Sequence, residues 1–312
     1  QDYADYQAIV QEPLTVNYRG FALCSPDLPT TGSSYIFPTL AVLEGLKFEP
    51  GVLRSPANLA LLAKIWAAVV PQAFKGNIRE LLKPESIASI RAKLARVDGL
   101  DTRDLGPVEK LAYDRSYADS ASTCSLATMD AEGNMCSMTQ SDSSHFGSGV
   151  VPPGTGIIMS NANGNFNFED PTNWNYVAPG KRSSSTIVPT IVLQDGQPVF
   201  SIGLPGGGRI PSGVMEAIID HIDFGRPFDE AIGDVRFNLQ LPGLGGQGGP
   251  NVSGFEFESS VDAKLVEELK ANGFKITTVE EPFGGINVIE RKPDGTMIGN
   301  ADPRRANAAS GY

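Results

Sequence analysis

The residues of this chain that could do acid-base or nucleophilic chemistry are few, and no familiar catalytic set is complete. Its two histidines are His145 and His221, and its three cysteines are Cys24, Cys124 and Cys136. Neither histidine accompanies a Gly-x-Ser-x-Gly turn, which would carry the serine of a Ser-His-Asp triad. His221 falls in the helical pattern MEAIIDHIDF and His145 precedes FGSG, so a structural role in a helix and a loop role are the favoured interpretations.

A metal or redox centre is not indicated by these residues either. The cysteines form no Cys-x-x-Cys pair, and the chain lacks the Cys/His spacing of a zinc site. An odd and sparse set of cysteines also argues against a disulfide framework and leaves the redox compartment open. We therefore expect neither a metal ion nor a cofactor.

The glycine loop PGGGRI, residues 205–210, is the clearest local signal for binding. It lacks the Lys-Ser/Thr of a phosphate loop and the full spacing of a dinucleotide fingerprint, so a nucleotide site is not favoured. Glycines at the end of a strand can present backbone N–H groups closely to a ligand, which is the geometry of an oxyanion hole. A tight strand-to-helix turn explains the glycines equally well until another part of the chain supplies a nucleophile.

The bulk composition limits the class of protein. The chain has 312 residues, 41% of them hydrophobic, and a net charge of -11. This composition predicts a globular fold, and the negative charge without any Lys/Arg run argues against nucleic acid or anionic lipid as partners. The longest apolar segment, residues 59–70, contains Lys64, is followed by Pro71 and is too short to span a bilayer, so we predict a packed helix.

The elements that must position these residues follow from periodicity. Apolar residues at three- and four-residue spacing predict helices between about residues 35 and 115. From residue 123 onward strand signals dominate, beginning with the runs TCSLATMD and MCSMTQS around the turn AEGN. Residues 185–204 predict a second hairpin whose continuous apolar character indicates burial on both faces. Further elements are predicted as a helix after PGGGRI, a helix at 261–273, and strands in FKITTVE, GINVIERK and TMIGNADP.

Helical and strand blocks in this order predict two stacked sheets between helical layers, an α+β fold. A family resemblance adds detail. The motifs TCSLATMDAEGN, FGSGVVPPGTGIIMSN, GKRSSSTIVPTIVLQDGQPVFSIGLPGGGRI and ADPRRANAASGY occur in this order. Together they resemble the small subunit of γ-glutamyltransferases, and residues 16–45 are similar to the later part of that family's large subunit. The resemblance covers nearly the whole chain, is densest from 123 to 220, and implies that the family's first half lies in front of Gln1.

The resemblance implies the four-layer αββα fold of the N-terminal-nucleophile (Ntn) hydrolases and a precursor that cuts itself before a threonine. That threonine falls on Thr123, with Ser122 supplying the carbonyl that is attacked. Residues 1–122 would then be the mainly helical C-terminal part of the large subunit, residues 123–312 the small subunit, and the two would form a heterodimer. A freed α-amine has a pKa of about 8 and can act as base for its own hydroxyl, so no histidine is needed.

Other family roles carry over residue by residue. Gly206 and Gly207 match the pair whose N–H groups hold the oxyanion, and Ser141 matches a threonine that supports the nucleophile. Ser185 and Thr186 match two serines that bind the α-carboxylate of a small-molecule substrate. Cys124 is a rival nucleophile, but it alternates to the opposite face of the strand from Thr123.

Departures from the family pattern concern the amino group of the substrate. Ser143 replaces an asparagine, and Gly164 and Asn165 stand where the family has an essential aspartate, although Asp142 is a neighbouring carboxylate. A desolvated ammonium needs such an acceptor, so we expect γ-glutamyl compounds to bind poorly. The expected function is a divergent acyl or amide hydrolase. The alternatives are glutathione hydrolysis, carbon-carbon bond cleavage as in natural-product relatives, and a scaffold that does not process itself. The family's carboxylate-binding arginine would lie upstream of this chain.

Overall fold

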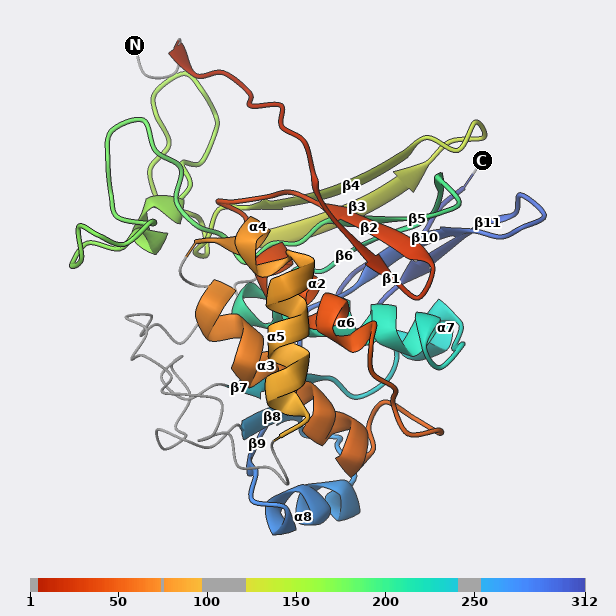
Figure 1. The fold of residues 1–312 in the computed structure, drawn as a ribbon. Coiled ribbons are helices and arrows are strands. Elements are labelled where there is room, and N and C mark those ends of the chain that lie inside the picture. Colours follow the sequence, from red (N-terminus) through yellow and green to blue (C-terminus); the bar gives the residue numbers. More distant parts are fainter. Residues whose placement is uncertain (1–4, 74–75, 97–121, 241–253, 312) are drawn as a thin grey trace.

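A six-stranded antiparallel sheet forms the middle of the fold, with helices on one face and a separate hairpin on the other (Figure 1). The computed structural model describes residues 5–73, 76–96, 122–240 and 254–311. The strand order in the sheet is β1-β2-β5-β6-β10-β11. Its strands are β1 (Leu14–Tyr18), β2 (Phe21–Ser25), β5 (Thr190–Gln194), β6 (Gln197–Gly203), β10 (Asn287–Arg291) and β11 (Met297–Ala301).

The hairpin consists of β3 (Thr123–Met129) and β4 (Met135–Ser141), which pair in register from Thr123 opposite Ser141 to Met129 opposite Met135. Its alternating residues divide into an exposed face and a face that packs on the sheet. On the packed face the hydroxyl of Ser137 donates to the carbonyl of Ile202 in β6 over 3.0 Å. The hairpin is therefore a second β layer, as the periodicity predicts.

The helical layer covers the opposite face of the sheet. It contains α2 (Gly32–Leu43), α3 (Pro56–Ala73), α4 (Ile78–Leu81), α5 (Pro84–Leu94), α6 (Ile210–Ile222) and α7 (Phe228–Ala231). Helix α2 is buried on nearly every side because it lies between β1, α3, α5 and α6, which explains why its sequence has no polar face. Helix α3 confirms the packed helix expected at 59–70 and continues two residues past Pro71. No helix in the described part of the chain is long and apolar enough to cross a membrane.

A smaller three-stranded sheet lies beside the helices and contains β7 (Phe237–Gln240), β8 (Gly254–Glu258) and β9 (Lys275–Val279). Strand β8 pairs antiparallel with β7 and parallel with β9, and helix α8 (Ala263–Ala271) connects β8 to β9. Phenylalanines at 237, 255, 257 and 274 pack their rings together and join this sheet to the core.

One expectation about the strands needs correction, and two further strands were not expected. The second hairpin begins at Thr190 and not at 185, because residues 185–188 leave the ladder and the backbone of Ser185 pairs with Pro29 and Thr31. Strands β1 and β2 were not predicted, and their turn uses Arg19 and Gly20 at positive φ, without the Asn-Gly or Asp-Gly signature of such turns. The helical periodicity expected beyond residue 96 falls outside the described residues.

Candidate active site

Thr123 and Ser141 form a hydroxyl pair at the open end of the hairpin. Their cross-strand register places Thr123 Oγ1 at 2.9 Å from Ser141 Oγ. Thr123 is 4% exposed, whereas Cys124, the next residue, is exposed on the other face of the strand. The face that holds the hydroxyl pair is the one that packs on the large sheet, so Thr123 is enclosed and Cys124 is not.

The backbone after Ser141 helps to orient this pair. The N–H of Ser143 donates to Ser141 Oγ over 2.9 Å, and Ser143 itself has φ +72°. A non-glycine residue in this left-handed region is uncommon and costs conformational energy, and such residues cluster at functional sites. Because one lone pair of Ser141 Oγ is taken by Ser143, the remaining hydrogen-bonding capacity of the hydroxyl is directed to Thr123.

The glycine loop follows β6 and begins α6. Gly207 has φ +59° and starts a single 3-10 turn, η3 (Gly207–Arg209). The carbonyl of Gly206 accepts from Arg209 N over 3.1 Å, and the carbonyl of Gly207 accepts from Thr186 Oγ1 over 2.8 Å. Among the described residues the N–H groups of Gly206 and Gly207 donate to no acceptor. The loop therefore has the carbonyls of both glycines hydrogen-bonded within the protein.

Strand β6, which precedes the glycine loop, packs against the β3–β4 hairpin. Ser201 Oγ donates to Cys136 O over 3.3 Å, and a Cβ on Gly203 would lie 2.2 Å from Ser125 Oγ and 3.5 Å from Thr139 Oγ1. Ser201 thus lies beside Cys136, whereas Gly203 lies beside Ser125 and Thr139, which are closer to the open end of the hairpin. The glycine loop at 205–207 follows β6 directly after Gly203, the residue that packs against the hairpin.

The segment at 183–186 passes beside the same loop. The Thr186 hydroxyl donates to Gly207 O, so binding a carboxylate with that hydrogen would require the hydroxyl to rotate. Ser185 is held through its backbone, with its N–H on Pro29 O and its carbonyl bonded by Thr31. The start of α2 packs tightly here, since a Cβ on Gly32 would lie 2.4 Å from Thr186 O. The Ser185 hydroxyl oxygen accepts from Ile187 N over 3.5 Å.

Asn165, which with Gly164 stands where the resemblance leads us to expect an aspartate, acts as a donor. It lies in η2 (Ala162–Asn165), and its Nδ2 donates to Ser184 O over 3.1 Å. Its own carbonyl accepts from Asn175 Nδ2 over 2.7 Å. An aspartate could not donate in this way, so the local structure is adapted to the neutral amide. Asp142, the alternative carboxylate, has its backbone carbonyl bonded by Asn161 N over 2.9 Å.

Sequence reasoning missed Asn175 and Arg305. Asn175 is 6% exposed and joins residues 165 and 184 through its carboxamide, and no sequence motif marks it. Arg305 Nη1 donates to Thr123 O over 3.4 Å, although the two residues are 182 positions apart. It belongs to the ADPRR motif, whose position near the C-terminus gave no indication of this contact.

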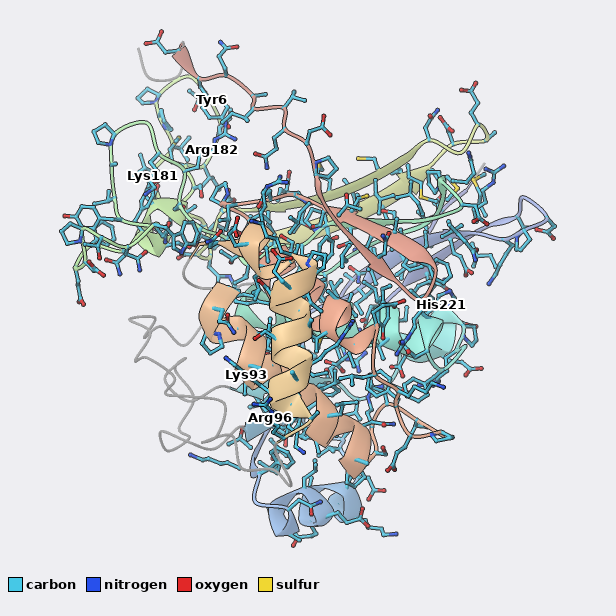
Figure 2. All side chains as sticks on the ribbon, in the orientation of Figure 1. Tyr6, Lys93, Arg96, Lys181, Arg182 and His221 are labelled. Atoms are coloured by element: carbon cyan, nitrogen blue, oxygen red, sulfur yellow. The ribbon has the colours of Figure 1, made fainter. Side chains whose placement is uncertain are left out.

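The two histidines lie outside this arrangement. His221 stacks on Phe228 of α7 at a ring distance of 4.1 Å, and its Nδ1 is 2.8 Å from Arg226 O (Figure 2). His145 is exposed in the loop after β4. Within the ranges that the structure describes, no three His, Cys, Asp or Glu side chains are grouped so that they could hold a metal ion.

The chain is similar to known proteins along nearly its whole length. Residues 1–312 match the family model described as Gamma-glutamyltranspeptidase. The chain is 29% identical over 304 residues to the acylase ACY 1 proenzyme of Pseudomonas sp. strain SE83, covering 96% of this chain and 52% of that protein. It is 25% identical over 332 residues to the glutathione hydrolase proenzyme of Bacillus subtilis strain 168, covering 100% of this chain and 54% of that protein.

The fold is also similar to a solved structure. Cephalosporin acylase from Bacillus halodurans superposes with a TM-score of 0.79 at 25% identity, over 100% of this chain and 55% of that one. The chain thus spans about half the length of the curated relatives it matches. The Ntn-hydrolase fold, with a mixed α/β structure and antiparallel sheets, is confirmed.

Proposed function

Because the chain belongs to the gamma-glutamyltranspeptidase family, we propose that it is part of a self-processing amide hydrolase with Thr123 as its nucleophile. The observation that supports this most directly is the buried hydroxyl pair, in which Thr123 Oγ1 lies 2.9 Å from Ser141 Oγ at the first position of β3. Relatives named proenzymes, such as the Pseudomonas acylase, support the processing step. Water is the proposed acyl acceptor.

Processing uses the same hydroxyl that later acts in catalysis. Thr123 Oγ1 attacks the carbonyl carbon of Ser122, the C–N bond breaks, and the acyl group passes from nitrogen to oxygen as an ester. Water then hydrolyses the ester, which leaves a carboxylate on Ser122 and a free α-amine on Thr123. The α-amine, with a pKa of about 8, becomes the base for the hydroxyl of the same residue.

Catalysis follows the same geometry with an external carbonyl. The α-amine of Thr123 accepts the hydroxyl proton as Oγ1 attacks, and Ser141 keeps Oγ1 oriented through their hydrogen bond. The N–H groups of Gly206 and Gly207 donate to the oxyanion, a contribution that is commonly worth about 10²–10³ in kcat. The proton passes to the leaving amine, and water then releases the acyl group from Thr123.

The proposed substrate is an amide whose acyl part carries a carboxylate but no free α-ammonium. Asn165 supports this, because it is neutral and its Nδ2 is engaged with Ser184 O. Ser185 is proposed to donate to the carboxylate of the acyl group, and Thr186 to fix the glycine loop through Gly207 O. The similarity to proteins named acylases points the same way.

A second candidate is hydrolysis of glutathione or other γ-glutamyl compounds. It is favoured by the similarity to proteins named glutathione hydrolase proenzyme. In that case Asp142 and Ser143 would have to replace the missing aspartate as acceptors for the ammonium.

The two products of processing, residues 1–122 and 123–312, are proposed to remain together as a heterodimer. Strand β2 of the first pairs with β5 of the second in one sheet. Arg54, from the first, donates to the buried Glu216 and Asp220 of α6 over 3.0 and 2.6 Å. Cutting one peptide bond at residue 122 leaves all of these contacts in place.

Two p-nitroanilides that differ only in the α-ammonium test the proposal. The purified wild type is expected to yield two fragments, one beginning at Thr123 by mass spectrometry, and to hydrolyse glutaryl-p-nitroanilide faster than γ-glutamyl-p-nitroanilide. Thr123→Ala is expected to stay whole and inactive. An intact wild type, or a Thr123→Ala protein that retains activity, would refute the nucleophile; faster release from the γ-glutamyl compound would refute only the substrate class.

A further inference from the structure

We propose that residues 283–286 form a buttress that holds the glycine loop in its oxyanion-binding conformation, and that Arg236 and Glu258 are positioning residues for it. This inference rests on the proposed function, in which Gly206 and Gly207 donate to the oxyanion. Oxyanion donors contribute only if they are already in place when the charge develops. Two glycines in sequence have little conformational preference of their own, so their geometry needs support from outside the loop.

The buttress touches the glycine loop through a glycine of its own. Gly284 has φ +67°, and a Cβ at this position would lie 1.9 Å from Pro205 O. From the other side, a Cβ on Gly206 would lie 3.5 Å from the Cα of Gly284. The two backbones are therefore in direct contact, and a single methyl group on Gly284 must displace one of them.

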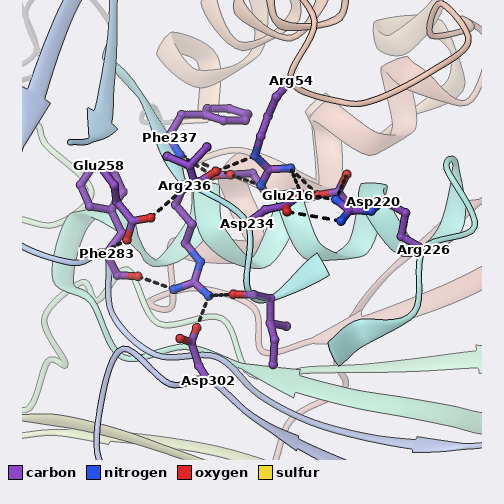
Figure 3. A network of polar contacts seen from close by, with 12 residues as sticks. Arg54, Glu216, Asp220, Arg226, Asp234, Arg236, Phe237, Glu258, Phe283 and Asp302 are labelled. Carbon is purple, nitrogen blue, oxygen red and sulfur yellow. Dashed lines mark hydrogen bonds and ion pairs between the residues drawn. The ribbon is translucent and has the colours of Figure 1, made fainter. Parts of the chain in front are cut away.

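Buried charged side chains hold the backbone on both sides of this contact, and Figure 3 shows those around Phe283. The N–H of Phe283 donates to Glu258 Oε1 over 2.9 Å, and its carbonyl accepts from Arg236 Nη1 over 2.7 Å. The N–H of Ile286 donates to Asp302 Oδ2 over 3.0 Å, and that carboxylate also pairs with Arg236. The two glycines at 284 and 285 thus lie between two residues whose backbones are fixed.

The charged groups form one network. Glu258 also accepts from Arg236 N over 2.9 Å and from Arg304 at 2.6 and 2.7 Å. Burial alone would raise the pKa of Glu258, but hydrogen bonds from Arg304 and the two N–H groups outweigh it and leave the pKa lower than usual. Burying these charged side chains costs desolvation free energy, and apolar side chains could fill the same volume without that cost. Hydrogen bonds add direction, which is what fixing the backbone of a loop requires.

Two more contacts connect the buttress to the catalytic residues. The Arg209 guanidinium, directly after the glycine loop, lies over the Phe283 ring at 4.3 Å and donates to Glu256 over 3.0 Å. A Cβ on Gly285 would lie 3.2 Å from the Cβ of Arg305, the residue that donates to Thr123 O. The buttress therefore contacts both the oxyanion loop and a side chain bonded to the nucleophile.

Gly284→Ala tests the contact, and Gly225→Ala is its matched control. Both glycines have positive φ, +67° and +65°, so the added methyl group causes similar backbone strain, but a Cβ on Gly225 meets nothing within 4 Å. With glutaryl-p-nitroanilide, kcat of the processed Gly284→Ala enzyme is expected to fall 10- to 1,000-fold with KM within about threefold. Gly225→Ala is expected to keep kcat. A Gly284→Ala enzyme with kcat within twofold of wild type would overturn the proposal.

A second pair of variants tests the buttress if Gly284→Ala does not fold. Arg236→Lys keeps a positive charge but cannot keep the bonds to Phe283 O, Ile232 O and Asp302 together. Arg54→Lys is the control, because Arg54 is also largely buried and bonded to carboxylates but does not contact the buttress. Arg236→Lys alone is expected to lose about tenfold in kcat at constant KM. Equal losses in both variants, or none in Arg236→Lys, would overturn the buttress without affecting Thr123, which the Thr123→Ala variant tests separately.

Discussion

The backbone N–H of Ser143 donates to the side-chain oxygen of Ser141, and Ser141 in turn lies 2.9 Å from the hydroxyl of Thr123. A left-handed backbone at residue 143 is thereby connected to Thr123, the proposed nucleophile, through a single hydroxyl group. The positive φ of Ser143 directs its N–H at Ser141 Oγ, so a strained backbone conformation helps to hold one member of the hydroxyl pair in place.

Removing the hydroxyl of Ser141 is expected to lower activity while the fold is kept. Ser141→Ala deprives Thr123 Oγ1 of its partner and leaves the Ser143 N–H without an acceptor, so kcat with glutaryl-p-nitroanilide should fall about 100-fold. Ser141→Thr keeps the hydroxyl and should retain most of kcat. Steady-state kinetics of the processed variants checks this, and equal activity of the alanine and threonine variants would contradict it.

The strain at Ser143 is measurable as stability. Ser143→Gly removes the left-handed penalty of a side chain and should raise the free energy of unfolding by about 1 kcal/mol. Ser144→Gly is the control, because the backbone there is not at positive φ and the Ser144 hydroxyl accepts from Asn161 Nδ2 over 3.0 Å. It should be destabilising. Denaturant unfolding of both variants measures whether each change raises or lowers the free energy of unfolding. A destabilised Ser143→Gly would show that the backbone at φ +72° carries no strain.

Asn165 is expected to set the preference against an ammonium group. Asn165→Asp replaces the donor to Ser184 O with a carboxylate that can accept from a substrate ammonium. The ratio of kcat/KM for γ-glutamyl-p-nitroanilide to that for glutaryl-p-nitroanilide should rise at least about tenfold, which corresponds to about 1.4 kcal/mol.

Asp142→Asn is the companion variant. It should leave that ratio unchanged if Asp142 takes no part, and should lower it if Asp142 already supplies the acceptor. An Asn165→Asp enzyme with an unchanged ratio would show that residue 165 does not face the α-position of the acyl group.

Local elements and their faces could be predicted from the sequence, whereas long-range contacts could not. Alternation predicts that Thr123 and Cys124 face opposite ways, and the turn AEGN fixes the register that brings Ser141 opposite Thr123. Periodicity likewise gives α6 and α8. Family resemblance was needed to select Thr123 among many strand threonines, because nothing in its neighbours marks a nucleophile.

The contacts that could not be predicted from the sequence join residues that are far apart along the chain. Arg236 reaches Phe283 and Asp302 across 47 and 66 positions, and no local pattern encodes such pairs. In the sequence Gly284 resembles an ordinary turn glycine, and its close contact with Pro205 O is seen only in the structure. The hydrogen bond from Thr186 to Gly207 O is similar, since a hydroxyl residue predicts a donor but not its acceptor. These contacts depend on how the elements pack in the tertiary structure.

Glu216 predicts how stability depends on pH. This carboxyl is fully buried in α6, and burial raises its pKa to about 8 even though Arg54 and Arg236 act to lower it. An unfolded chain would release the same proton near its ordinary value of 4.5. Between these two values the folded state holds more protons than the unfolded state, so the free energy of unfolding must decrease as pH rises. The contribution is on the order of a few kcal/mol and is complete above the folded pKa.

Glu216→Gln is neutral at every pH and should remove this part of the pH dependence, while its carbonyl oxygen can still accept from Phe237 N. Denaturant unfolding from pH 5 to pH 8.5 should give a flatter profile for Glu216→Gln than for the wild type, with the largest gain in stability at the alkaline end. Glu267→Gln, on the exposed face of α8, is the control and should follow the wild-type profile. Parallel profiles for wild type and Glu216→Gln would mean that Arg54 keeps Glu216 ionised throughout, and that the buried ion pair outweighs desolvation.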